Sequence, residues 1–262
     1  MKKLITILSV LMLALSISAQ NLTSKKGENY LPESGEWSIG FDATSTLNYV
    51  GNLFNSGALA PTTDYMVGNA FYGKMMQSEN SALRATIGIN MYKNVDKTLV
   101  ADLNQSASAG DMVENKYSIG TTNITLGLGK EYRRGSTRLQ GVYGAEALLT
   151  LTSTTEKWEY GNSAEDRGAF NDMIESKSGL GLGVGVRAFI GAEYFVLPKM
   201  SISGEYGWSL GFSTTGGGSM TTETYDPVDD DVDTETSDGA SDSWFGFSND
   251  NSGGRIGLHL YF

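Results

Sequence analysis

The last ten residues of the chain, GGRIGLHLYF (253–262), decide the fold class. Successive side chains of an extended strand point to opposite faces. The stretch therefore has a large apolar face, made of Ile256, Leu258, Leu260 and Phe262, and a second face made of Arg255, Gly257, His259 and Tyr261. Chain ends are normally polar and frayed. An end of this kind predicts a strand that is held by its neighbours and has one face in apolar surroundings.

The first 19 residues have the pattern of a secretory signal peptide. Lys2 and Lys3 precede an apolar run from Leu4 to Ile17, and small residues follow at Ser18 and Ala19. The run is shorter than the roughly 20 residues that a spanning helix needs. We therefore expect the mature chain to begin near Gln20, outside the bacterial cytoplasm.

Composition excludes several classes of protein. The chain has no Cys, so it has no disulfide framework, thiolate zinc site or Cys nucleophile. Its formal net charge of -11 argues against nucleic acid as a partner, because phosphate binding needs a basic face. No apolar stretch after Ala19 is long enough for a spanning helix, which excludes a helical membrane protein.

Apolar and polar residues alternate with a period of two along most of the mature chain. The clearest stretch is GLGLGVGVRAFIGAEYF (179–195). The pattern predicts eight strands, at residues 37–49, 65–77, 82–93, 117–133, 137–155, 177–195, 200–214 and 244–262. The facing of the second strand is ambiguous.

The connections between these strands alternate between short and long. Short turns are expected at residues 78–81, 135–136 and around Pro198, and long connections at 50–64, 94–116, 156–176 and 215–243. This asymmetry is typical of outer-membrane barrels. It predicts an all-β fold, an eight-stranded antiparallel transmembrane β-barrel with short periplasmic turns and long extracellular loops. The domains would be a signal peptide (1–19), a periplasmic N-terminal segment (20–36) and the barrel (37–262).

A secreted soluble eight-stranded barrel is the alternative, with its apolar face inward. The polar faces favour the membrane barrel, because they carry mostly Gly, Ser and Thr, whereas a soluble exterior would carry Lys and Glu. Aromatic residues near strand ends would form girdles at the two lipid interfaces, namely Trp37, Tyr49, Tyr143, Tyr206, Trp208, Phe212 and Phe262.

Two segments carry a resemblance to known proteins. The alternating last strand with the aromatic Phe262 resembles the signal that the outer-membrane barrel assembly machinery reads. LPESGEWSIGFDATSTLNYVGNLFN (31–55) resembles the start of a family of porin-like outer-membrane β-barrel proteins of the Bacteroidota, as does a signal peptide ending in Ala19-Gln20. The resemblance implies a barrel in the bacterial outer membrane, with lipid and lipopolysaccharide as partners, and it implies no chemistry.

Charged residues on the expected lumen faces alternate in sign around the wall. The set is Asp42, Arg84, Glu146, Arg187, Glu205 and Arg255, which His259 and Glu193 could extend. Unpaired charges in a narrow lumen are costly, so we expect a salt-bridged plug. An ion-selective path or proton relay is the alternative. No Ser or Asp can be tied to His259, so no catalytic residue is assigned and the chain is not expected to be an enzyme.

The longest connection is strongly acidic. Its carboxylates include Asp229, Asp231, Asp233 and Glu235, which could gather around calcium, although the spacing departs from the twelve-residue calcium loop. A solvated, mobile acidic loop without metal or cofactor is the preferred interpretation. Three classes of function follow in order of preference: a structural or interaction barrel that acts through its loops with a protein partner not identified, a narrow channel, and an outer-membrane enzyme.

Overall fold

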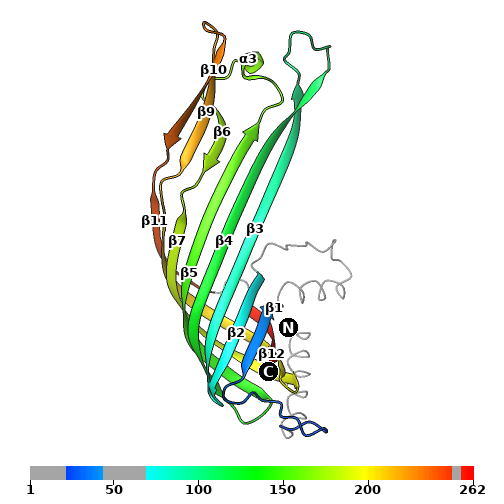
Figure 1. Cartoon of the computed structure of the whole chain (residues 1–262), viewed down its shortest axis with the longest axis vertical. Helices are drawn as coiled ribbons and strands as arrows, with labels where there is room; N and C mark the ends of the chain where they lie inside the picture. The colour runs from blue at the N-terminus through cyan, green and yellow to red at the C-terminus, as the bar shows by residue number, and fades with distance from the viewer. Residues whose placement is uncertain (1–21, 44–68, 250–254) are drawn as a thin grey trace, which may run out of the picture.

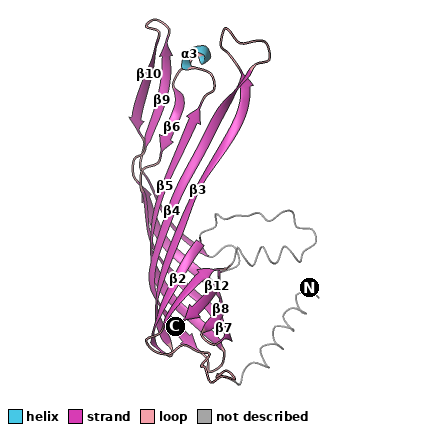
Figure 2. Cartoon of the chain, turned by 45° about the vertical axis from the view of Figure 1, so that its right-hand side comes forward, coloured by secondary structure: helices cyan, strands magenta, loops and turns pink. Residues whose placement is uncertain are grey.

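Eight antiparallel strands pair in a closed ring at one end of the molecule (Figures 1 and 2). The computed structural model describes residues 22–43, 69–249 and 255–262. The ring strands, in order, are β1 (Trp37–Asp42), β2 (Asn69–Ser78), β3 (Ser81–Ala101), β4 (Met112–Arg134), β5 (Leu139–Glu159), β7 (Gly181–Leu197), β8 (Met200–Thr215) and β12 (Arg255–Tyr261). Each pairs with the next, and β12 pairs with β1 to close the ring.

The short turns lie together at one end of the ring, here called the short-turn end. Glu79 and Asn80 alone separate β2 from β3, and Pro198 and Lys199 alone separate β7 from β8. Proline presets its own backbone angle, and Lys199 adopts the left-handed φ of 59° that the tight turn needs. The predicted positions of these turns are confirmed.

Two strands, β3 and β4, are much longer than predicted, and β5 ends four residues later than predicted. β3, β4 and β5 have 21, 23 and 21 residues, and they stay paired far beyond the ring. Their upper parts (92–101, 112–121 and 154–159) join three further strands, β6 (Asp172–Lys177), β9 (Ser219–Asp226) and β10 (Asp231–Asp238). This six-stranded extension, here called the tall sheet, rises on one side of the ring (Figure 1). The residues expected to form the long connections 94–116 and 156–176 are therefore partly strand.

The acidic segment is an ordered hairpin, so the prediction of a mobile loop is wrong. β9 and β10 pair from Ser219↔Asp238 to Asp231↔Asp226, and β9 also pairs with β6. Threonine is favoured in strands, and Thr221 and Thr236 join across the hairpin with a 3.0 Å hydrogen bond. The alternation of acidic residues with Val, Thr and Ser in DVDTETSD (231–238) therefore indicated a strand, although this stretch has only one apolar residue.

Two predicted strands need correction. The predicted strand 177–195 corresponds to β7, which begins four residues later, while Lys177 ends the separate strand β6, which pairs with β9 in the tall sheet. The segment 244–262 contains β11 (Asp242–Asn249) and β12, which both pair with β8. Asn249 of β11 pairs with Trp208, and Arg255 of β12 pairs with Glu205. Only two residues of β8 lie between these two partners, but five residues of the sequence lie between Asn249 and Arg255, so one continuous strand cannot make both pairings.

The polarity of the ring is inverted relative to a soluble protein. Inward side chains at the short-turn half are polar or charged and fully buried, including Lys74, Arg84, Glu131, Glu146 and Arg187. Outward side chains are large, apolar and exposed on every ring strand, for example Ile39, Phe71, Ile87, Leu128, Tyr143, Val186, Trp208 and Leu260. The facing of β2, which the sequence left open, places Tyr72, Lys74 and Met76 inside.

The N-terminal segment lies against the short-turn end of the ring. Tyr30 and Leu31 pack on a cluster of Met76, Ala82, Phe195 and Tyr261. The Arg138 guanidinium lies 3.9 Å from the Tyr30 ring centroid, and Lys199 Nζ lies 2.6 Å from Glu36 Oε1. The predicted signal peptide, residues 44–49 and 65–68 of the first two predicted strands, and residues 250–254 of the last one lie outside the described residues.

The pairing pattern predicts that the β9–β10 hairpin is dispensable for the ring. Ser219 and Asp238 are cross-strand partners, so an Asn-Gly turn can join them when residues 220–237 are deleted. We expect this variant to refold with an unfolding midpoint in urea close to that of the parent, because the described contacts of the hairpin are with β6 and with the segment around Arg167–Asn171, and none is with a ring strand below the tall sheet. Deletion of Leu258–Phe262 is the control and should prevent folding, since β12 closes the ring. Failure of the hairpin deletion to fold would show that the tall sheet is part of the folding unit.

Candidate functional site

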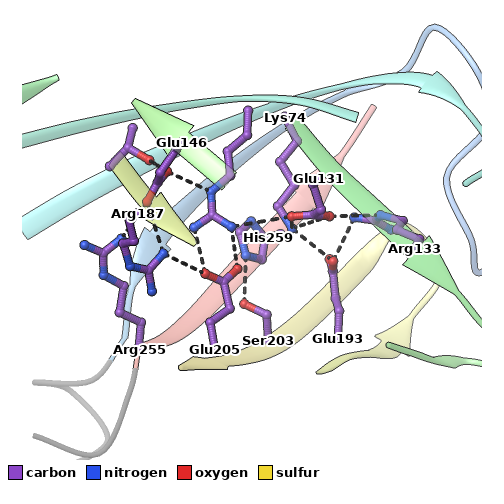
Figure 3. A network of polar contacts seen from close by, with 12 residues as sticks. Lys74, Glu131, Arg133, Glu146, Arg187, Glu193, Ser203, Glu205, Arg255 and His259 are labelled. Carbon is purple, nitrogen blue, oxygen red and sulfur yellow. Dashed lines mark hydrogen bonds and ion pairs between the residues drawn. The ribbon is translucent and has the colours of Figure 1, made fainter. Parts of the chain in front are cut away.

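A continuous network of buried ion pairs fills the inside of the ring at its short-turn half (Figure 3). It has two layers, which differ in their distance from the short-turn end. The upper layer consists of Arg84, Glu146, Arg187, Glu205 and Arg255, and the lower layer of Lys74, Glu131, Arg133 and Glu193 with Tyr261. All the charged side chains of both layers except that of Arg255 are at most 3% exposed.

Arg84 is the centre of the upper layer. Its guanidinium donates to both Glu205 carboxylate oxygens, at 2.6 and 2.8 Å, and lies 3.5 Å from Glu146 Oε2. It also lies over the rings of Phe189 and Tyr72, at 4.5 and 5.3 Å from the ring centroids. A bidentate pair fixes both the position and the plane of the carboxylate. Arg84 is therefore held from three sides.

The remaining arginines of the upper layer share the same two carboxylates. Arg187 lies 3.0 Å from Glu146 and 3.7 Å from Glu205, and Arg255 lies 3.5 Å from Glu146. Strand register explains the Glu146–Arg187 pair, because these residues face each other across β5 and β7, whereas Arg255, which faces Glu205 across β8 and β12, reaches across the interior to Glu146. Arg255 differs from the others because its side chain is 30% exposed.

The lower layer is organised around two carboxylates. Lys74 Nζ lies 2.9 Å from Glu131 and 3.0 Å from Glu193, and Arg133 pairs with the same two residues at 3.1 and 2.7 Å. Tyr261 donates to Glu193 at 2.7 Å, and Ser201 donates to the same carboxylate oxygen. The two layers meet at Arg84 and Glu131, 3.5 Å apart.

Glycines make room for these long side chains. A Cβ on Gly207 would lie 2.5 Å from Arg187 Nε, and one on Gly129 would lie 2.6 Å from the Glu146 Cβ. A Cβ on Gly40 would lie 2.3 Å from His259 Nδ1. Real Cβ atoms do not approach so closely, so the alternating glycines of the inward faces set the positions at which charged side chains can lie along the wall.

The structure brings together five of the six residues that the sequence singled out, namely Arg84, Glu146, Arg187, Glu205 and Arg255. Asp42 of β1 lies on the same inward face, opposite Gly257, and is half-buried. Sequence reasoning missed Lys74, Glu131 and Arg133. For Glu131 and Arg133 the signal was present, since both flank the outward Tyr132 in an alternating strand. Lys74 lies on the strand whose facing the sequence did not resolve.

His259 lies inside the ring with Ser203, its Nε2 3.0 Å from the Ser203 Oγ. Both side chains are buried, and among the described residues His259 Nδ1 has no hydrogen-bond partner. A catalytic triad needs a third group that orients the imidazole and a path for substrate. The pair therefore offers no support for hydrolytic chemistry, and the expected absence of a catalytic residue stays a prediction.

The candidate calcium ligands all lie on the β9–β10 hairpin. Asp229 is in its turn, and Asp231, Asp233 and Glu235 project from one face of β10 and are exposed. Within the ranges that the structure describes, no three His, Asp or Glu side chains are grouped so that they could hold a metal ion. Calcium binding stays a prediction. Among the same residues, no helix is long and apolar enough to cross a membrane.

Above the network the inside of the ring is lined by small residues. A hollow of about 410 Å³ is bordered by Gly183, Gly185, Ser209 and Thr150, with Trp244 of β11 on its rim. Among the described residues, the interior therefore changes from a filled lower half to an upper half with this hollow.

Comparisons with known proteins add little. No protein-family model and no curated protein sequence matches the chain. Among solved structures, it is similar to the crystal structure of a major outer membrane protein from Thermus thermophilus. The identity is 15%, the match covers 87% of this chain and 97% of that chain, and the TM-score is 0.36. A TM-score this low supports no conclusion about this chain, and the resemblance to a Bacteroidota family stays a prediction.

The geometry predicts that Arg84→Met strongly destabilises the protein. The substitution removes both short hydrogen bonds to the buried Glu205 and leaves Arg187 3.7 Å away, and breaking a buried ion pair by removing one partner costs about 3–5 kcal/mol. Lys97→Met is the matched control, because Lys97 pairs with Glu114 at 3.0 Å with both side chains well exposed, and such pairs contribute about 0–1 kcal/mol. Urea unfolding of both variants in phospholipid vesicles measures the difference. Equal losses would show that the network is not what stabilises the ring.

Proposed function

We propose that the chain is an outer-membrane protein of a bacterium, with the ring as an eight-stranded transmembrane β-barrel. The inverted polarity carries this proposal. Charged side chains are buried inside, while large apolar side chains are exposed around the whole outer surface. In water such an exterior would aggregate. In lipid it is the expected arrangement, and a closed ring satisfies the backbone of every strand.

The dimensions of the apolar exterior fit a bilayer. On β3 the outward-facing residues of the apolar band begin at Leu83 and end at Met91, so the band spans nine residues of the strand. A membrane strand needs about 9–11 residues. Aromatic side chains lie at the short-turn end of this band, where Tyr132 and Tyr143 stack with centroids 5.6 Å apart. Lys130 lies over the Tyr132 ring, as a cationic residue at a membrane interface would. The short-turn end would then face the periplasm and the tall sheet the outside.

We further propose that the barrel anchors the tall sheet and does not conduct ions. The network crosses the inside of the ring with side chains that leave almost no exposed surface. Its Arg84–Glu205 and Lys74–Glu193 pairs join opposite parts of the wall. The role of the protein would be structural or adhesive, carried by surfaces beyond the membrane. A Bacteroidota source, a secretory signal peptide at residues 1–19 and recognition of Phe262 by the barrel assembly machinery belong to the same proposal.

Tryptophan fluorescence tests the membrane placement. The chain has four Trp, of which Trp208 projects outward from the ring and Trp158 lies on β5 in the tall sheet beside Tyr117. Two single-Trp variants, made with Phe at the other three positions, are refolded into vesicles with brominated acyl chains. We expect strong quenching of Trp208 and little quenching of Trp158. An unquenched Trp208 would reject the transmembrane barrel and support the soluble one.

Planar bilayer recording tests the closed interior. We expect no stable current steps from the inserted protein, because ion-paired side chains fill the cross-section. Insertion is verified in the same preparation by the Trp208 quenching assay. Reproducible steps would overturn the closed barrel and establish the narrow-channel alternative, with the Arg and Glu residues of the upper layer as its charged constriction.

A further inference from the structure

The outward face of the tall sheet carries a patch of lysines directly above the apolar band. Strand register places them in successive rows. Lys93, Gly120, Thr155 and Lys177 form the first row, and Val95, Ser118, Lys157 and Glu175 the second. Lys97, Lys116 and Glu159 form the third. The row immediately below the first consists of Met91, Thr122 and Ser153, which ends the apolar band.

These lysines are exposed and only partly neutralised. Lys157 and Lys177 lie 3.0 and 2.5 Å from opposite oxygens of Glu175, with lysine side chains 52% and 51% exposed. Lys97 and Lys116 pair with Glu114 and Glu159, at 3.0 and 3.5 Å. With Lys93, the patch has five ammonium groups, and three carboxylates lie beside them, those of Glu114, Glu159 and Glu175. The patch is therefore cationic although the whole chain has a formal net charge of -11.

The opposite face of the same sheet has the reverse charge. Alternation and register place these carboxylates on the face that continues the inside of the ring: Asp96, Glu156, Asp226, Asp231, Asp233 and Glu235. Contacts support the assignment, since Tyr117 donates to Glu156 and Asn94 to Asp96. An exposed sheet in water normally mixes both signs on each face. On the outward face the lysines gather on β3, β4, β5 and β6, whereas register places Glu223 and Asp238 on the same face farther along the sheet, on β9 and β10.

We propose that the outward lysine patch binds the phosphate groups of the lipid headgroups that surround the barrel in the outer leaflet. This inference rests on the proposed membrane placement, which puts the first lysine row at headgroup height. Ammonium groups in this position attract anionic lipids, each by about fivefold. The neighbouring Glu side chains hold the lysines extended along the sheet, and phosphate can replace them as the partner without any change in the strands.

A lipid-proximity experiment tests the proposal. The absence of Cys allows one fluorophore at a single introduced cysteine, Ser153→Cys, an exposed position one row below Lys93 and Lys177. The labelled protein is refolded into phosphatidylcholine vesicles that contain a small fraction of acceptor-labelled lipid, either anionic phosphatidylglycerol or zwitterionic phosphatidylcholine. We expect at least twofold more energy transfer to the anionic acceptor at low salt, and loss of the difference at about 0.5 M salt because salt screens exposed charges.

Matched variants assign the effect to the patch. Lys93→Gln with Lys177→Gln should abolish most of the preference, while Glu175 keeps Lys157 as its partner. Lys25→Gln with Lys26→Gln changes the net charge equally at the short-turn end and should leave the preference intact. A fluorophore at Ser136→Cys, in the β4–β5 turn, is the control for position. Its ratio of energy transfer to the anionic and zwitterionic acceptors should be the same with and without the Lys93 and Lys177 substitutions.

Two outcomes separate this inference from the proposed function. Equal transfer to both acceptors, in protein whose Trp208 is quenched by brominated lipid, would overturn the lysine patch as a lipid site and leave the membrane barrel in place. Absence of Trp208 quenching would reject the barrel itself, and the lysine proposal with it.

Discussion

The ion network inside the ring is the constraint on which the rest of the structure depends. Eight strands enclose a space that side chains can fill, and here the filling is ionic, with Arg84 and Glu205 at its centre. Buried charges are tolerated only when they are paired with good geometry. All the described ion pairs of the network except Glu131–Arg133 join two different strands, so they depend on the register of those strands. Cohesion therefore comes from the inside, and the outer surface is free to be apolar.

Much of the ring followed from alternation alone. The outward and inward faces of the last strand, the short turns, and the pairing of Glu146 with Arg187 all depend on period two, which the sequence displays directly. The residues at which the ring strands end were harder to predict from the sequence. The upper parts of β3, β4 and β5 are strands because they pair with one another, and β5 also pairs with β6, but the local sequence does not record this pairing.

The errors share one physical cause. Apolar residues were treated as the signature of a strand, so the segment with Asp231, Asp233 and Glu235 was expected to be mobile. In the tall sheet, however, backbone hydrogen bonds and Thr side chains stabilise the hairpin with little apolar burial. Lys74 was missed for a related reason, since both faces of β2 carry large side chains and only the surrounding carboxylates decide which face is inside.

The β10 strand has a further consequence at high protein density. It ends the strand order on one side of the tall sheet, and an exposed strand edge is a template for pairing with another chain. In the proposed membrane placement, copies of the protein would stand upright at a common height, so this edge would repeatedly meet the same edge of a neighbouring copy. Negative side chains along β10 repel a second copy in that encounter. In that placement, copies could crowd side by side without their sheets joining into a continuous ribbon.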